Sequence, residues 1–329
     1  MKSATANDVA RLAGVSRSAV SRTFSGNGFV SSEKREKILK AAQQLDYRPN
    51  AIASSLASRQ SNMVAVIINK LPDGRSPYFY NALMNAIQEQ GLLPLMVMVE
   101  PGEDGIRTLN RAAAYPVRGM VVMGDSVHPA ATGSIVSMTR PIILNGQWTG
   151  DDEVDAVVID QRQGISDMVA DLAATGHRTV AFMGGRSTAL IARDRRSALI
   201  DAMVAHGLTL VAEGNGDFKY DQAHEEAIRM FSAGKLPDAL FCANDIMAFA
   251  AMDALRYKLG RNVPDDISVI GYDDNISARW GAYQLSTIRQ SSDDVIGQIL
   301  SLLTEPRQQP GQFRVRTEYI RRTTVALRR

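Results

Sequence analysis

The chain has 329 residues, of which 45% are hydrophobic and 22% charged, so collagen-like and disordered classes are excluded and two or three globular domains are possible. The single cysteine, Cys242, excludes an internal disulfide and a cysteine-cluster metal site, which agrees with a reducing compartment. No apolar run approaches the roughly 18 residues of a membrane span, and no apolar signal region opens the chain, so a cytoplasmic protein is expected.

Positive charge is concentrated near the N-terminus. Residues 1–60 contain ten Lys and Arg against four Asp and Glu, a net charge of +6, whereas the remainder contains 27 against 31, a net charge of −4. A basic N-terminal part on a mildly acidic body predicts a polyanionic partner for the N-terminal part alone.

Two short helices joined by a tight turn are expected first. Thr5 and Asp8 have the spacing of a capping box with Asp in place of Glu, and Gly14 can end the helix that they begin. Ser16 can cap a second helix that extends to about Phe24. This arrangement is typical of a helix-turn-helix.

A third helix is expected to begin at Ser31 or Ser32 and to cover the first two. Its apolar face would consist of Ile38, Leu39, Ala42 and Leu45. An ordinary three-helix domain with a solvated basic surface is the alternative, but the tight turn, the caps and the charge distribution together favour DNA binding. Arg17 and Ser18 lie where a recognition helix meets base edges, and Arg suits a bidentate contact with guanine.

Residues 50–57, which follow Pro49, also favour a helix. Only about two turns are available, and an isolated helix shorter than roughly 12 residues is marginal in water. This segment should therefore fold only when something pairs with it.

From Asn62 onward, apolar runs alternate with amphipathic helices at the spacing of βαβ units. Strands are expected at 64–68, 95–99, 119–123, 141–144, 156–159, 179–183, 239–242 and 267–271. Helices are expected at 79–90, 164–175, 190–206, 222–233 and 246–259. The alternation predicts an α/β body of two doubly wound subdomains with a ligand cleft between them. The polar segments 151–155, 285–291 and 311–317 are interpreted as loops that cross between the subdomains.

Ligands of doubly wound sheets bind beyond the carboxyl ends of the strands. The residues at those positions and at nearby helix starts are mostly polar, with two aromatics: Phe79, Ser126, Asn145, Arg186, Arg193, Arg195, Phe218, Asn244, Asp245, Asp273 and Asp274. Such a set suits a small polar or polyhydroxylated molecule. Taken singly, each could instead be structural, with Asp273 in a turn, Arg195 in a surface ion pair and Phe79 in the core.

Catalysis, metal binding and a cofactor have little support in the sequence. Gly184 and Gly185 follow a strand but lack the spacing of a phosphate-binding loop, and the four histidines are scattered without ligand spacing. No nucleophile and base, and no pair of carboxylates, stand out.

The N-terminal motifs resemble the DNA-binding head of the LacI/GalR (lactose-repressor) family of bacterial regulators. They are Thr5, Asp8-Val9-Ala10, Ala13-Gly14-Val15-Ser16, Val20-Ser21-Arg22, Val30-Ser31, Arg35, Ile38 and Tyr47-Arg48-Pro49-Asn50. The resemblance implies that Arg17 and Ser18 read bases in the major groove and that Arg22 adds base or phosphate contacts. The residues implied to anchor the DNA backbone are Thr5, Ser16 and Ser31.

Asn50, Ala53, Leu56 and Ala57 are similar to the hinge helix of that family. In the family, two hinge helices of a dimer pair in the minor groove, and a leucine pushes the central base step apart. Leu56 is the matching residue. Such a wedge costs a few kcal/mol of unstacking, which the bent DNA returns through added contacts.

The resemblance extends over the body through several motifs in the same order. They are 174–178, Arg193-Asp-Arg195, Ala243-Asn-Asp245, 266–274 and 285–288. It implies a fold like that of periplasmic sugar-binding proteins, in which Arg195 and Asp273 bind effector hydroxyls or a carboxylate. Asn244 and Asp245 would line the second subdomain, and Phe218 and Phe79 would contact the apolar face of the effector. Asn145 stands where many sugar-responsive members have aspartate, so a plain hexose is less secure as the effector.

The expected protein is a homodimeric, effector-controlled transcriptional repressor that acts on a pseudo-palindromic operator. Its domains are expected at 1–48, 49–60 and 61–329, with an N-subdomain of about 61–158 and 290–318 and a C-subdomain of about 159–289 and 319–329. No heptads follow Thr323, so a tetramerising helix is not expected. The alternatives are an activator of the same architecture, a solute-binding protein without DNA function, and a sugar-modifying enzyme. A solute-binding protein or a sugar-modifying enzyme would leave residues 1–57 unexplained.

Overall fold

The computed structural model describes residues 4–25, 28–48, 61–69, 77–99, 105–123, 141–144, 154–187, 189–305, 309 and 311–328. The chain divides into two compact units, Met1–Ser61 and Asn62–Arg329, which we call the head and the body. No helix within the described ranges is both long enough and apolar enough to cross a bilayer.

The head contains three helices, α1 (Ala6–Ala13), α2 (Arg17–Ser25) and α3 (Ser32–Gln44), as predicted. Their shared core consists of Val9, Ala10, Val20, Ile38, Ala41 and Ala42. Leu39 was expected in the covering face of α3, but its side chain is 47% exposed and Ala41 is buried instead. The expectation for Leu39 is therefore wrong, because α3 turns a slightly different face toward the other two helices.

Local capping defines the helix ends of the head. The Thr5 hydroxyl accepts from the Asp8 amide while the Asp8 carboxylate accepts from the Thr5 amide, which is the predicted capping box. Gly14 ends α1 with φ of 65°, a conformation that costs glycine little. The Ser16 hydroxyl accepts from the Ala19 amide at 3.2 Å and so caps α2. Ser31 occupies the N-cap of α3, although its side chain makes no capping hydrogen bond.

The described strands of the body form one sheet in the order β2-β1-β3-β4-β5-β11-β10-β9-β8-β6-β7. The strands are β1 (Met63–Asn69), β2 (Leu93–Val99), β3 (Val117–Met123), β4 (Pro141–Leu144), β5 (Asp155–Asp160), β6 (Thr179–Gly184), β7 (Thr209–Asn215), β8 (Ala239–Cys242), β9 (Ser268–Asp273), β10 (Ser286–Gln290) and β11 (Gln312–Ile320). The α-helices are α5 (Pro77–Glu89), α6 (Gly105–Ala113), α7 (Arg162–Ala174), α8 (Leu190–His206), α9 (Tyr220–Phe231), α10 (Asp245–Asp253) and α11 (Ser292–Thr304), with a short π-helix η2 (Ala254–Lys258) and a short 3-10 helix η3 (Ile276–Arg279).

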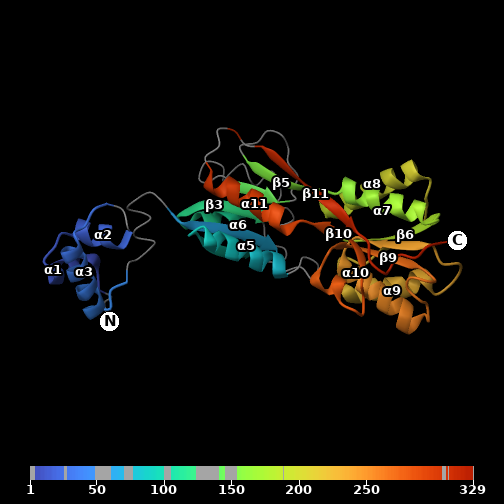
Figure 1. Cartoon of the computed structure of the whole chain (residues 1–329), viewed down its shortest axis with the longest axis horizontal. Helices are drawn as coiled ribbons and strands as arrows, with labels where there is room; N and C mark the ends of the chain where they lie inside the picture. Colours follow the sequence, from blue (N-terminus) through green and yellow to red (C-terminus); the bar gives the residue numbers. More distant parts are fainter. Residues whose placement is uncertain are drawn as a thin grey trace. The chain divides into compact units, whose positions relative to one another are not determined.

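Strand β11 joins two halves of the sheet, each with helices on both faces (Figure 1). Its residues 312–316 pair in parallel with β5, and its residues 317–320 pair antiparallel with β10. In the half that begins at β2, α5 and α11 pack on one face and α6 on the other. In the half that ends at β7, α7 and α8 lie on one face and α9 and α10 on the other, around a separate core (Figure 1). The predicted α/β fold class is confirmed.

Two segments interpreted as loops are strands. Residues 286–290 form β10 and residues 312–320 form β11, whereas residues 151–153 of the third segment lie outside the described ranges. Two polar residues of β10 are buried because tertiary partners satisfy them: Thr287 donates to Asp245, and Gln290 donates to Asp273. Strand β7 and helices α6 and α11 were not predicted.

Candidate functional site

Helix α2 and the residue before it present a row of exposed polar side chains. Ser16, Arg17, Ser18 and Arg22 are all exposed. The Ser16 and Ser18 hydroxyls lie 2.9 Å apart, and Arg22 donates from Nε to the Ser18 carbonyl (3.2 Å) and from Nη2 to the Ser18 hydroxyl (3.3 Å). The row therefore offers guanidinium donors and hydroxyl groups along the exposed side of α2, the groups that contact base edges and phosphates in a major groove.

The three residues implied to anchor a DNA backbone all precede helix starts. Thr5 is the N-cap of α1, Ser16 precedes α2, and Ser31 is the N-cap of α3. Helix N-termini carry unpaired amides and a partial positive charge, which suits them to phosphate. Five other predicted site residues lie outside the described ranges: Asn50, Ala53, Leu56, Ser126 and Asn145.

In the body, Arg195 is the centre of a buried polar cluster. It lies on the inner face of α8 and is only 3% exposed. Its guanidinium lies 3.5 Å from the centroid of the Tyr272 ring, and it donates to the Ala243 carbonyl. It also donates from Nε to Gln161 Oε1 (3.4 Å) and from Nη2 to Asp273 Oδ1 (3.5 Å). The cluster thus holds a cation in a fixed orientation at the carboxyl end of β9.

Asp273 and Asp274 form a left-handed turn that aims two carboxylates in different directions. Their φ angles are 115° and 49°. Asp273 accepts from Gln290 Nε2 at 2.7 Å, in addition to the longer contact with Arg195. The side chain of Asp274 is 2% exposed and pairs with Arg279, Arg289 and Arg322. Asp273 therefore belongs to the polar cluster, whereas Asp274 is an internal structural anchor.

Asp245 and Asn244 are engaged by the protein itself. Asp245 accepts from the Thr287 hydroxyl (2.5 Å) and from the Asn275 amide (2.6 Å). Complete burial, reinforced by the neighbouring charge of Asp273, raises the pKa of Asp245 well above the ordinary carboxyl value. Asn244 is the N-cap of α10 and accepts from the Met247 amide at 2.9 Å. Their role toward an effector stays a prediction.

The two predicted aromatic residues occupy different environments. The Phe218 ring lies against Gly185, where an added Cβ would be 2.1 Å from the ring, so only glycine permits this approach. Asn244 links to the same loop through the Phe218 carbonyl, at 3.5 Å. Phe79 is 5% exposed and belongs to the core of the half that contains α5.

Three members of the cluster, Gln161, Tyr272 and Gln290, were not predicted as site residues from the sequence. Gln161 is 8% exposed and accepts from both Arg195 and the Tyr272 hydroxyl. It follows β5 directly, so the rule that inspects residues after strands could have found it. Gln290 lies on β10, which the sequence presented as a loop.

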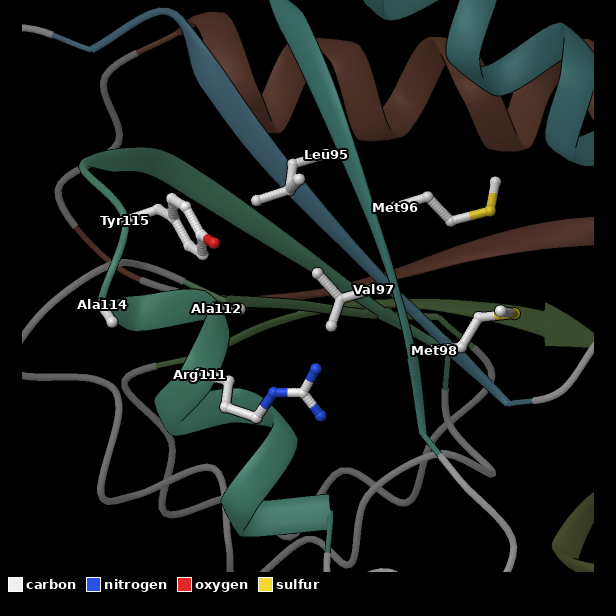
Figure 2. Close-up of a pocket in the computed structure, with 8 residues that line it drawn as sticks. All are labelled: Leu95, Met96, Val97, Met98, Arg111, Ala112, Ala114 and Tyr115. Carbon is white, nitrogen blue, oxygen red and sulfur yellow. The ribbon is translucent and has the colours of Figure 1, made fainter. Parts of the chain in front are cut away.

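A second surface feature lies at the edge of the sheet. A groove of about 560 Å³ is lined by Leu95, Met96, Val97, Met98, Arg111, Ala112, Ala114 and Tyr115. Figure 2 shows Leu95 and Val97 toward Tyr115 and Arg111, and Met96 and Met98 on the other side of the strand. Met98 and Tyr115 are each 48% exposed and Met96 is 41% exposed, although β2 is a sheet edge.

A helix-turn-helix head joined to a periplasmic-binding-protein-like body is the architecture of a DNA-binding transcriptional regulator. Comparison with known proteins finds the same two parts. The family described as "Bacterial regulatory proteins, lacI family" matches residues 5–50, and "Periplasmic binding protein-like domain" matches residues 169–325. The HTH-type transcriptional repressor PurR of Haemophilus influenzae is 30% identical over 309 residues, 92% of this chain and 90% of that protein. The chain belongs to the lacI family of bacterial regulatory proteins.

Two further relatives match over almost the full length. The probable HTH-type transcriptional repressor ExuR of Bacillus subtilis is 26% identical over 328 residues, 98% of each chain. A crystal structure of the Lac repressor dimer bound to operator and the anti-inducer ONPF superposes with a TM-score of 0.86 at 25% identity, covering 99% of this chain and all of that one. The family resemblance seen in the sequence is confirmed.

Proposed function

We propose that the protein is a homodimeric repressor whose affinity for a pseudo-palindromic operator is controlled by a small polar effector bound at the Arg195 cluster. The proposal is supported above all by the burial and hydrogen bonding of Arg195. It is almost fully buried, yet its hydrogen bonds to described residues use three of its five N–H groups. The remaining donors, beside the Asp273 carboxylate, suit the hydroxyl and carboxylate oxygens of a sugar, polyol or sugar acid.

Operator recognition would use the exposed row on α2. Arg17 and Ser18 would read bases, Arg22 would add a base or phosphate contact, and the starts of α1 and α3 would hold phosphates. The Lac repressor relative was crystallised as a dimer on its operator, which supports the same stoichiometry here. Two heads related by a twofold axis require an operator with matching symmetry.

A second copy of the chain would cover the groove on β2 and α6. Proteins usually blunt an exposed sheet edge with charges or short strands. Strand β2 instead exposes Met96 and Met98 on one of its faces, and the exposed ring of Tyr115 lies on the other face, beside the groove (Figure 2). Exposed apolar side chains on both faces of such an edge favour a protein partner over water.

Effector and operator would be coupled through residues 50–57. An effector that prefers one arrangement of the two halves of the body shifts the population of that arrangement, and its differential affinity sets the size of the effect. The hinge segments of the two subunits would then pair, or fail to pair, with Leu56 as the minor-groove wedge. Leu56→Ala should weaken binding to the operator more than binding to random DNA, and an equal loss on both would refute the wedge.

The experiment has two stages. Full-length protein first selects its operator from random duplexes, and a thermal-shift screen of sugars, polyols, sugar acids and nucleosides finds the effector, since a ligand of the folded state raises its stability. Arg195→Ala should then abolish the effect of that compound on operator affinity while operator affinity itself persists. Arg196→Ala is the matched control, because Arg196 is an exposed neighbour paired with Glu213. An unchanged effector response in Arg195→Ala would refute the proposed site, and failure to select any duplex would refute operator binding.

A further inference from the structure

The head exposes one large aromatic side chain that its own core does not use. Phe29 is 88% exposed, compared with 51% for Leu12 and 47% for Leu39, the other exposed large hydrophobic residues of the described head. The neighbouring Val30 and the nearby Phe24 both pack against the core of the head. Phe29 therefore contributes little to folding, and its place on the surface needs another explanation.

Packing places Gly28, the residue before Phe29, beside Arg22 of the row on α2. Gly28 has a φ of +98°, and a Cβ added there would lie 3.0 Å from Cδ and 3.5 Å from Cγ of Arg22. The backbone that leads into Phe29 thus rests on the aliphatic part of Arg22, which in turn donates to Ser18. Two residues further on, Ser31 occupies the N-cap position of α3. In the chain, Phe29 therefore stands between Gly28, which contacts Arg22, and Ser31, at a helix start proposed to contact phosphate.

The chemistry of the ring restricts what it can contact on DNA. A phenyl group offers no hydrogen bond to phosphate or to the polar edges of guanine, cytosine or adenine. The 5-methyl group of thymine is the apolar feature of the major groove, and phenylalanine is one of the side chains that contact it. Covering both the ring and the methyl group removes apolar surface from water, which favours binding.

We propose that Phe29 contacts the 5-methyl group of one thymine in each operator half-site, next to the position contacted by Arg22, and so helps to determine operator sequence. This inference rests on the proposed operator binding. It adds an apolar element of specificity to the polar contacts of Arg17 and Ser18.

Replacing thymine by deoxyuridine tests the contact, because deoxyuridine lacks only the methyl group. The operator is the duplex selected by the wild-type protein, and each thymine is replaced in turn at symmetric positions of both half-sites. Dissociation constants are measured by fluorescence anisotropy at one salt concentration for wild type and Phe29→Ala. At one symmetric position, deoxyuridine should weaken wild-type binding about fourfold per half-site, the amount expected for one buried methyl group. The same replacement should leave the affinity of Phe29→Ala unchanged.

The controls separate this contact from a general loss of binding. Leu39→Ala removes another exposed apolar side chain of the head and should retain the wild-type response to deoxyuridine. Phe29→Leu keeps an apolar side chain and should retain part of the discrimination. Equal effects of deoxyuridine on wild type and Phe29→Ala at every position, or a selected half-site without thymine, would overturn the inference while operator binding stands. If no duplex is selected, the proposed function falls and this inference with it.

Discussion

Replacing Asp274 by asparagine should destabilise the body, because this carboxylate anchors three guanidinium groups. Arg279, Arg289 and Arg322 donate to it at 3.0, 2.8 and 2.6 Å. Their side chains are 57%, 36% and 12% exposed, so the three pairs contribute unequally. The exposed Arg279 pair contributes about 0–1 kcal/mol. Arg289 keeps a second partner in Glu318, at 3.4 Å.

Arg322 determines the size of the effect. The guanidinium of Arg322 is largely buried. Without the charge of Asp274, its hydrogen-bond partner among the described residues of the body is the Leu285 carbonyl alone. Breaking a buried pair by removing one partner typically costs about 3–5 kcal/mol, and asparagine still offers one acceptor oxygen. We therefore expect Asp274→Asn to lower the free energy of unfolding by about 3 kcal/mol at neutral pH.

The pH dependence supplies a second signature. Burial alone would raise the pKa of Asp274, but hydrogen bonds from Arg289, Arg322 and Arg279 outweigh it and lower the pKa below the ordinary carboxyl value. A carboxyl group whose pKa is lower in the folded state stabilises the protein above its unfolded pKa, of about 4, and this stability is lost as the pH falls through the folded pKa. The difference between wild type and variant should therefore shrink on acidification below about pH 4.

Denaturant unfolding followed by tryptophan fluorescence measures this difference. Both tryptophans of the chain, Trp148 and Trp280, belong to the body, so the signal does not report on the head. Arg279→Ala is the control and should cost no more than about 1 kcal/mol. A loss below about 1 kcal/mol for Asp274→Asn, or a loss equal to that of the control, would refute the reasoning.

Three further changes test other parts of the molecule. Asp245→Asn should raise the melting temperature near pH 8 and have a smaller effect near pH 4. The reason is that burial raises the pKa of Asp245, so wild-type stability falls as the pH rises from the ordinary carboxyl pKa to the raised one. A difference in melting temperature that does not vary with pH would contradict this. Gly185→Ala should push the Phe218 ring out of place. Binding of the effector found in the thermal-shift screen should then weaken roughly tenfold, or by about 1.4 kcal/mol, as measured by isothermal titration calorimetry. Unchanged affinity would show that Phe218 does not belong to the site. Met98→Lys should weaken self-association at least about tenfold in sedimentation experiments, because a charge opposes burial of the edge strand. Val204→Lys, on the exposed surface of α8, is the control and should not weaken it. Equal dimer content in the two variants would exclude the β2 surface as the dimer interface.

The head could be predicted closely because its signals are local. Thr5 and Asp8 satisfy each other across one helical turn, and Gly14 ends α1 through its own backbone conformation. Each of these interactions spans at most a few residues, so spacing in the sequence is enough to recognise it. The same holds for α8, whose bounds at 190 and 206 agree with the expectation.

The strands that join the two halves of the body could not be predicted in this way. Strand β10 carries Thr287 and Gln290, which read as loop residues until the partners that bury them are known. Those partners are Asp245 and Asp273, which are 42 and 17 residues away in the chain. Burial of a polar side chain depends on such distant partners, and composition does not contain them.

The candidate effector site could likewise be predicted only in part from the sequence. The rule that ligands bind beyond strand ends pointed to Arg195 and Asp273 from the sequence alone. Only the folded chain brings Gln161 to the Arg195 guanidinium, and only there do burial and the neighbouring charge of Asp273 raise the pKa of Asp245. Residue types and spacings therefore determine most of the helices, the helix ends of the head and the positions where a ligand can bind. Tertiary contacts decide which of those residues are satisfied by the protein and which remain for a ligand, because hydrogen bonding and pKa depend on neighbours brought together by folding.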